Sequence, residues 1–331
     1  MKSRALAASV LILAAVVVVG SAAPALGQKK RVVLACSQAT SSFYTQCVAV
    51  AQVINEQVPA LDVSVMETGG AVASMKLLLN ERADIALTTT DQAYLAWHGL
   101  ENWKETPFKD IRALVYTTSS ANYLIVREDS GIQNIQGLSG KKFNPGMRGS
   151  STEKLTQMVL EDLGITPDWQ RMAASDAVAG IIDNRLVGYA KVGSGFAFDG
   201  PTMEIAAKTK IRVLPFTEAE AKKSRTKHPF LSWAKVPANT IKGLGEFWTP
   251  AVSSGFTVRK SFPAELAYAV IKAVSSEKGA ATVKAAFPGF TADPGKLTVD
   301  VATSPLHVGV LRYVVDKGQQ VSGDLVPPEK K

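Results

Sequence analysis

The chain has 331 residues, of which 46% are hydrophobic and 20% are charged, and it contains 25 glycines and 16 prolines. These proportions are typical of a globular protein and exclude a disordered or fibrous chain. The net charge of +8 at pH 7 is spread thinly, without a basic block interleaved with aromatic residues. We therefore expect no nucleic acid as a partner.

The N-terminal segment has the composition of a secretory signal peptide. Two basic residues precede an apolar run over residues 5–19, and small residues follow it. Signal peptidase recognises this order, and the small residues place the cleavage after Ala25 or Gly27. The alternative, a retained membrane anchor, fits less well because about 20 apolar residues are needed to cross a bilayer. We predict a cleaved signal peptide over 1–27 and a periplasmic location.

Short β-rich runs alternate with helical patterns along the rest of the chain. Alternation of this kind predicts βαβ units and mainly parallel sheets flanked by helices, an α/β fold. The rhythm restarts after residue 126, which predicts two lobes, the second inserted into the first. Lobe I is expected over 28–124 plus 215–331, lobe II over 125–214, and a flexible tail over 327–331. The predicted strands are 31–35, 61–66, 85–88, 123–126, 211–214 and 255–258, and the predicted helices are 44–57, 71–80, 152–163, 264–275 and 308–316.

Two cysteines flank the loop that follows the first predicted strand. Cys36 ends that strand, and Cys47 lies near the start of the next helix. In an oxidising compartment the pair is a candidate for a disulfide, since a strand, loop and helix can bring two Cα atoms within about 7 Å. The alternative is that both are small buried hydrophobic residues.

Polar loops follow several of the predicted strands. Ligands of open parallel sheets bind beyond the carboxyl ends of the strands, so we expect these loops to converge on one site. The first loop offers hydroxyls, an amide and two aromatic rings, which suit a polar ligand. Its alternative role is ordinary capping, with Ser41 or Ser42 at the helix start and both rings in the core. The candidate ligand-binding residues in these loops are Ser37, Gln38, Thr40, Ser41, Ser42, Phe43, Tyr44, Thr68, Gly69, Gly70, Ala71, Thr90 and Asp91.

A glycine-bearing turn over residues 144–153 is the clearest single candidate site. Ser150 with Glu153 fits a capping box, which predicts a helix start here. Free amides at a helix start favour an anion, and Arg148 offers a bidentate contact to a carboxylate. The alternative is a capped helix with a solvated Arg148. The candidate ligand-binding residues of this turn are Arg148, Gly149, Ser150, Ser151 and Thr152.

No catalytic constellation stands out in the sequence. Ser151 and Lys154 match the Ser-x-x-Lys pattern of penicillin-binding enzymes, but the partner motifs of those enzymes are missing. Phosphate-binding glycine loops are missing too, so we expect no nucleotide site. Three isolated histidines offer no metal-ligand spacing. We expect no enzymatic activity, no metal and no cofactor, with a serine enzyme as the least favoured alternative.

The C-terminal segment contains the most specific motif. Pro305-Leu306-His307-Val308-Gly309, followed by Arg312-Tyr313, is close to Pro-Leu-His-Pro-Gly-Ala-x-Arg-Tyr. The pair Phe43-Tyr44, the turn Thr68-Gly69-Gly70 and the segment 146–152 are similar to further motifs of the same family. On these segments the chain resembles the TAXI-type solute receptors of tripartite ATP-independent periplasmic (TRAP) transporters, and the likeness covers nearly all of it after the signal peptide. His307 is then part of a structural motif.

Four positions depart from the family pattern near its ligand site. Ser41 and Cys47 stand where the family has glycines, Ala73 stands where it tends to have Asn, and Ser151 replaces the middle glycine of the second turn. These changes add side chains around the site, so the resemblance leaves the ligand open.

The resemblance implies a two-lobed periplasmic-binding-protein fold of type II-like organisation, with the ligand cleft between the lobes. It implies a monomeric receptor that closes around a small anionic solute, an organic acid or an amino acid, and delivers it to the membrane subunits of a TRAP permease. The strands near 123–126 and 213–216 are expected to cross between the lobes as hinges. The alternatives are a receptor for an ABC importer, which shares the fold, or a ligand-presenting partner of a membrane sensor.

Overall fold

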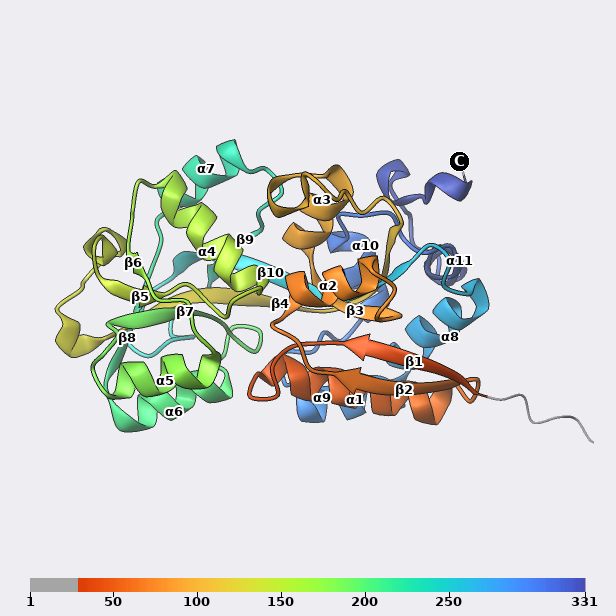
Figure 1. The fold of residues 1–331 in the computed structure, drawn as a ribbon, viewed down its shortest axis with the longest axis horizontal. Helices are drawn as coiled ribbons and strands as arrows, with labels where there is room; N and C mark the ends of the chain where they lie inside the picture. Colours follow the sequence, from red (N-terminus) through yellow and green to blue (C-terminus); the bar gives the residue numbers. More distant parts are fainter. Residues whose placement is uncertain (1–28, 331) are drawn as a thin grey trace, which may run out of the picture.

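The structure is a computed structural model that describes residues 29–330. It has two α/β lobes that share one sheet through two long strands (Figure 1). The strand order is β2 (Leu61–Met66), β1 (Lys30–Ala35), β3 (Ile85–Thr89), β10 (Phe247–Arg259), β4 (Ile111–Arg127), β7 (Gly188–Val192), β5 (Lys142–Asn144) and β6 (Asp168–Trp169), with β8 (Ile211–Leu214) on β4 and β9 (Trp233–Val236) on β10. Within residues 29–330 no helix has the length and apolar character that a bilayer crossing requires. The predicted signal peptide lies outside the described residues.

The first lobe begins with the predicted βαβ units. β1 pairs in parallel with β2 and β3. In β2 the side chains of Leu61 and Val63 are buried while Asp62 and Ser64 are exposed, as in an edge strand with one face on the core. The elements are β1 (Lys30–Ala35), α1 (Ser42–Gln57), β2 (Leu61–Met66), α2 (Ala71–Leu79), β3 (Ile85–Thr89), α3 (Thr90–His98) and the short helix η1 (Glu101–Trp103). The strand and helix predictions for this part are confirmed within a few residues.

Two long antiparallel strands, β4 (Ile111–Arg127) and β10 (Phe247–Arg259), run from one lobe into the other. Their register shifts between Ser254 and Gly255. Only glycine fits at position 255, because a Cβ there would lie 2.2 Å from the Val115 carbonyl oxygen. The sequence predicted only the ends of these strands, since both are buried on both faces and show no alternation of polar and apolar residues.

One expected crossing is wrong. Residues 211–214 form β8, an outer strand of the second lobe that pairs with β4, and the second crossing is β10. A four-residue strand pairs along β4 in the second lobe only, whereas β10 pairs with β3, β4 and β9 along its length.

The second lobe packs helices on both sides of its part of the sheet. Its elements are η2 (Glu128–Ser130), η3 (Ile135–Leu138), β5 (Lys142–Asn144), α4 (Ser151–Asp162), β6 (Asp168–Trp169), α5 (Ala174–Ile182), β7 (Gly188–Val192), α6 (Gly200–Lys208), β8 (Ile211–Leu214), α7 (Glu218–Lys227) and β9 (Trp233–Val236). Phe216 and Leu231 share one hydrophobic cluster with Phe143 and Leu155. The chain therefore stays with the second lobe beyond residue 214, where a return to the first lobe was expected.

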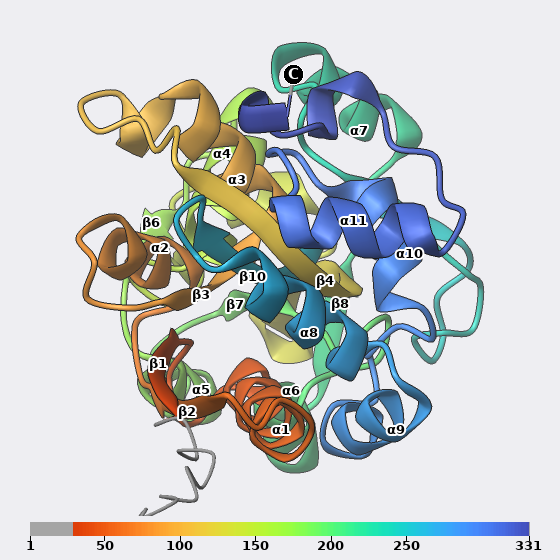
Figure 2. The same ribbon diagram turned by 90° about the vertical axis from the view of Figure 1, so that its right-hand side faces the viewer.

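The C-terminal helices cover the first lobe. They are α8 (Ala264–Val274), α9 (Glu277–Ala286), α10 (Pro294–Val301) and α11 (Val308–Asp316), followed by η4 (Gly323–Leu325) and η5 (Pro328–Lys330). Figure 2 shows α9 beside α1 and α11 beside α8. Val310 and Val314 of α11 point into the same core as Val270 and Ile271 of α8. This packing completes the core of the lobe.

The chain end is held in place up to residue 330. Glu329 accepts hydrogen bonds of 3.0 and 2.6 Å from the guanidinium of Arg112, which is itself buried. Pro327 is buried as well. The segment over 327–331 was expected to be a flexible tail, and in the structure a bidentate ion pair joins its residue 329 to β4.

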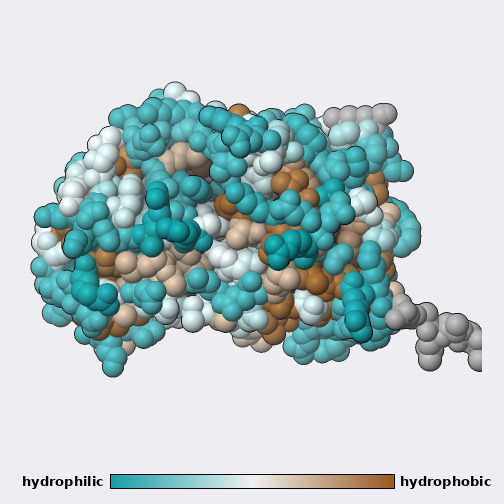
Figure 3. Space-filling view, viewed as in Figure 1, coloured by the Kyte–Doolittle hydropathy of each residue, from teal (hydrophilic) through white to brown (hydrophobic). Residues whose placement is uncertain are grey.

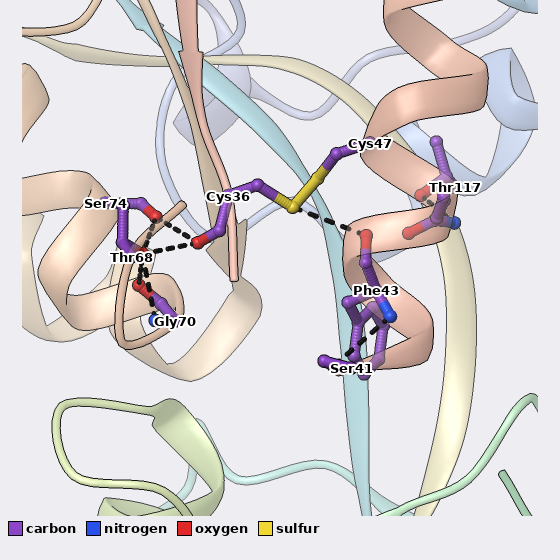
Figure 4. The surroundings of a disulfide bond; sticks show 9 residues. Cys36, Ser41, Phe43, Cys47, Thr68, Gly70, Ser74 and Thr117 are labelled. Atoms are coloured by element: carbon purple, nitrogen blue, oxygen red, sulfur yellow. Dashed lines mark hydrogen bonds between the residues drawn. A yellow bond between two sulfur atoms is a disulfide. The ribbon is translucent and has the colours of Figure 1, made fainter. Parts of the chain in front are cut away.

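Cys36 and Cys47 form a disulfide, with their Cα atoms 6.4 Å apart (Figure 4). Both residues are fully buried. The Cys36 carbonyl oxygen also accepts hydrogen bonds from the hydroxyls of Thr68 and Ser74, at 2.6 and 2.5 Å. The bond fixes the end of β1 against α1, and with it the loop between them.

Candidate functional site

A cavity lies between the two lobes and leaves about 50 Å³ open to water. The first lobe and the crossing strand contribute Ser37, Ser41, Phe43, Gly70, Ala71, Leu87, Thr89, Val252 and Ser254. The second lobe contributes Asn144, Gly146, Met147, Ser150, Ser151, Thr152, Ala174, Tyr189, Ala190, Lys191 and Val192. Most of the lining surface is apolar, and serine, threonine and tyrosine hydroxyls are spread over it. The molecular face in Figure 3 is hydrophilic over most of its area, with apolar residues in patches. The cavity therefore suits a small, partly polar solute.

Five helices begin at this cavity. Lining residues lie in the first turn or at the cap of α1 (Ser41), α2 (Ala71), α3 (Thr89), α4 (Ser151) and α5 (Ala174). The start of a helix carries roughly half a positive charge and unpaired amide donors. Because five such ends converge, the cavity favours a negatively charged group.

The turn before α4 is built as a helix start. The Ser150 hydroxyl accepts a hydrogen bond of 3.1 Å from the Glu153 amide, as predicted. The Glu153 carboxylate, however, accepts from the Gly149 amide at 2.8 Å, so only half of the expected capping box is present. The amides of Ser151 and Thr152 donate to no acceptor within residues 29–330. They are free to bind an anion in the cavity.

Arg148 does not reach this cavity. Its side chain is exposed, and Arg148 is not among the lining residues. Its backbone lies against the first lobe, because a Cβ on Gly69 would be 2.7 Å from the Arg148 carbonyl oxygen. The backbone of this turn therefore faces the first lobe, whereas the Arg148 side chain is exposed to solvent.

Lys191 is the charged side chain that lines the cavity within the described part of the chain. Its Nζ lies 3.0 Å from a carboxylate oxygen of Asp199, and both residues are buried. Asp199 also accepts hydrogen bonds from the amide and hydroxyl of Thr202 at the start of α6. The ion pair holds Lys191 at the wall of the cavity and compensates its charge.

Two buried hydroxyls of the wall differ in their partners. The Tyr189 hydroxyl lies 2.7 Å from that of Thr202, and burial, with the charge of Asp199, raises the pKa of Tyr189 well above its usual range. The Ser254 hydroxyl is fully buried and has no hydrogen-bond partner in residues 29–330. A buried hydroxyl without a partner on a cavity wall is a place for a polar atom of a ligand.

The first predicted loop divides between the cavity and the fold. Ser37, Ser41 and Phe43 line the cavity, whereas Ser42 and Tyr44 do not, and Tyr44 packs on the core. Ser41 is the helix cap, since its hydroxyl accepts from the Phe43 amide at 3.3 Å. Ser41 therefore both lines the cavity and caps α1.

Gln38 and Thr40, the other predicted residues of this loop, lie off the cavity. Gln38 accepts a hydrogen bond of 3.4 Å from the Ala174 amide in the second lobe. The side chain of Thr40 is exposed. Gln38 thus joins the lobes beside the site without lining it.

The turn before α2 brings two of its four predicted residues into the cavity. Gly70 and Ala71 line it, and Thr68 and Gly69 do not. The Thr68 hydroxyl is occupied by bonds to the Cys36 carbonyl and the Gly70 amide (Figure 4). Thr68 therefore shapes the turn.

Thr90 and Asp91 lie behind the cavity wall, and the neighbouring Thr89 lines it. The Asp91 carboxylate accepts a hydrogen bond of 3.0 Å from Gln92. Burial raises the pKa of Asp91, which favours its neutral form. Asp91 is thus a buried acid in the first turn of α3.

The two lobes touch at the edge of the cavity. The Ala73 amide donates to the Gly149 carbonyl oxygen at 3.3 Å, and Gln38 bonds to Ala174. Figure 1 shows the helices that carry this contact, α2 and α4, next to each other between the lobes. The two lobes are therefore in direct contact at this edge of the cavity.

The sequence missed the part of the cavity formed by strands. Leu87, Asn144, Tyr189, Lys191 and Val252 belong to β3, β5, β7 and β10. β7 was not predicted as a strand, although its five residues are a short buried run after Leu186. This run was the sequence feature that could have placed Tyr189 and Lys191 on a buried strand.

Groups that suggested enzymatic chemistry are placed otherwise. His307 is fully buried and caps α11, its Nδ1 accepting from the Gly309 amide at 3.2 Å. Ser151 lines the cavity, but Lys154 lines a different groove, beside Glu161 and His228. The two residues of the Ser-x-x-Lys pattern therefore do not share a site.

The two-lobed fold, with a cavity between the lobes, is that of solved periplasmic binding proteins. The chain belongs to the NMT1-like family, whose model matches residues 34–318.

Solved structures share the fold at low identity. A protein from Bordetella bronchiseptica RB50 is 14% identical with a TM-score of 0.55, over 88% of this chain and 99% of that one. The periplasmic binding protein BugD is 13% identical with a TM-score of 0.55, over 88% and 98%. A protein from Xanthomonas citri, solved with ATP bound, is 15% identical with a TM-score of 0.51, over 87% and 99%.

Proposed function

We propose that this protein is a periplasmic receptor of the TAXI type that captures a small carboxylate and delivers it to a TRAP permease. The observation that carries the proposal is the convergence of five helix starts on one small interlobe cavity. Amides of Ser151 and Thr152 provide the carboxylate donors, and Phe43, Leu87 and Val252 enclose the rest of the solute. This assignment replaces the Arg148 side chain by the backbone of the same turn as the anion-binding group.

Binding and closure are one step in this proposal. The solute contacts both lobes, because the α2 start belongs to one and the α4 start to the other. A solute that bridges them favours the closed form over the open one by its difference in affinity for the two. The permease then recognises the closed, loaded receptor.

A receptor function also explains which polar groups line the cavity. Its wall holds hydroxyls, amides and one ion pair, and Ser151 is separated from Lys154. These groups bind and orient a solute. We therefore propose a role in transport rather than catalysis.

A thermal-shift screen of the exported protein against organic acids and amino acids tests the binding. A ligand that binds only the native state increases the free energy of unfolding by mass action, by about 2.7 kcal/mol at one hundred times its Kd. The midpoint temperature of unfolding therefore rises. A panel of uncharged sugars is the control. No shift with any carboxylate would exclude the proposal.

The permease is tested separately, by uptake of the identified solute into cells that express the receptor with its neighbouring transport genes. Uptake that stops with an ionophore and continues when ATP is depleted supports a TRAP permease. Uptake that stops when ATP is depleted identifies an ABC importer instead. Ligand binding without any uptake identifies a sensor partner.

A further inference from the structure

The two lobes share a second contact, outside the cavity. Tyr94 of α3, in the first lobe, stacks on Phe230 of the second lobe, with ring centroids 4.7 Å apart and an angle of 14° between the ring planes. Phe230 and Met158 of α4 also pack against the hydrophobic cluster of the first lobe that contains Leu95 and Trp103. None of these five residues lines the cavity. The contact is therefore separate from the residues that surround the solute.

Phe230 is held by the second lobe through its neighbours on both sides. His228 lies beside the Phe230 ring, with centroids 5.6 Å apart, and the His228 Nε2 lies 3.3 Å from a carboxylate oxygen of the buried Asp162. Leu231 is buried in the hydrophobic cluster of the second lobe. Its amide donates to the His228 carbonyl oxygen at 3.0 Å. Residues 228–231 therefore form an anchored turn, from which Phe230 reaches the first lobe.

The helices that carry the contact also begin at the cavity. Thr89, which lines the cavity, is the cap of α3, and Tyr94 lies in the second turn of this helix. Ser151, which also lines the cavity, begins α4, and Met158 lies two turns further along. Figure 1 shows α3 and α4 facing each other where the lobes meet. A movement of one lobe relative to the other therefore changes the cavity and this contact together.

We propose that the contact among Tyr94, Met158 and Phe230 is a latch that holds the lobes together when no solute is bound. Stacked aromatic rings attract each other beyond the effect of the apolar area that they bury. The burial of Phe230 and Met158 against the first lobe adds to this attraction. Because the latch supplies part of the contact between the lobes, a solute has less of the closing equilibrium to shift.

The distance between two spin labels tests the latch in solute-free protein, refolded from urea with its disulfide intact so that no solute is carried over. The labels are attached at exposed positions, Lys272→Cys in α8 of the first lobe and Ala207→Cys in α6 of the second. We expect mainly one short distance in this labelled protein. Phe230→Ala should raise the ratio of separated to joined lobes roughly fivefold. Lobes that are mainly separated before this substitution would overturn the proposal.

A double-mutant cycle distinguishes the latch from a general loss of packing. Tyr94→Ala, in the other lobe, should raise the same ratio by a similar factor, and the double variant should add little to either single change. Trp169→Ala is the matched control, because Trp169 packs on Phe143 within the second lobe, with centroids 6.4 Å apart, and it should leave the distances unchanged. Factors that multiply in the double variant, or unchanged distances in Phe230→Ala, would overturn the proposal. Because no solute is present, either result leaves the proposed receptor function standing.

Discussion

The Ala73 amide donates a hydrogen bond of 3.3 Å to the Gly149 carbonyl oxygen, and this bond joins the two lobes at the edge of the cavity. Beside it, the backbone of Gly69 faces the Arg148 carbonyl oxygen so closely that a Cβ would lie 2.7 Å from it. The first and second lobes are therefore in backbone contact here, and side-chain volume at this edge determines whether they can close.

Gly69→Ala is expected to impair closure. Gly69 does not have a positive φ, so alanine is tolerated by its own backbone and the cost arises from the contact with the second lobe. Overpacking costs about 1–3 kcal/mol, and affinity for the solute should fall roughly five-fold to a hundred-fold. Calorimetry measures the affinity, and small-angle scattering with ligand measures the closure.

Gly200→Ala is the control for this variant, because a Cβ there meets nothing within 4 Å. The control should bind as the wild type does. If Gly69→Ala binds with wild-type affinity, the contact does not belong to the closing motion.

Removing the disulfide should destabilise the protein. Replacing Cys36 and Cys47 together by Ser removes a cross-link between β1 and α1, at a cost of about 2–4 kcal/mol in the free energy of unfolding. Urea unfolding measures the change, and reduction of the wild type should reproduce it. Thiol titration of unfolded, unreduced wild type should find no free thiol; two free thiols would contradict the bond.

Removing one partner of the buried ion pair should cost more than removing both. Lys191→Met leaves the buried Asp199 carboxylate without its cation and is expected to destabilise the protein by about 3–5 kcal/mol. Combining it with Asp199→Asn should recover part of that loss. A double-mutant cycle by urea unfolding measures the coupling, and additive losses would show that the pair is energetically unimportant.

Arg148→Ala is expected to change solute affinity by less than about threefold, because an exposed charge outside the cavity is screened by solvent. Calorimetry with the best ligand of the screen decides. A loss of thirty-fold or more would return the Arg148 side chain to the site.

Protein stability should fall in mild acid because of His307. Burial lowers the pKa of His307, with Arg112 and Glu329 as charged neighbours, so the folded state keeps the ring neutral. Below about pH 6.5 the His307 ring of the unfolded chain binds a proton, which favours the unfolded state. The contribution of the neutral ring to stability is therefore complete above that pH, and it is lost as the pH falls through the lowered pKa of the folded state. Thermal unfolding from pH 8 to pH 5 measures this, and His307→Asn should reduce the slope. An identical slope in the variant would assign it to other groups.

The sequence alone identified the elements whose signals are local. The strand Leu61–Met66 and the helix Val308–Asp316 were predicted with the bounds they have, because alternation and helical periodicity are fixed by which faces are buried. Ser150 was identified as a helix cap because capping depends on residues only a few positions apart. The repeated strand, polar loop and helix pattern likewise predicted a shared site, and Ser37, Gly70 and Ser151 do line one cavity.

Only the tertiary structure decided how these elements divide between the lobes and which side chains face the solute. Phe216 and Leu231 joined the second lobe by entering a hydrophobic cluster that also holds Phe143, which is far from them in sequence. Arg148 and Lys191 were both available cations, but the turn geometry at Gly149 directs one outward, and β7 places the other in the wall. Local periodicity and capping are short-range properties of a chain. The direction of a side chain in a cavity between two lobes depends on long-range packing.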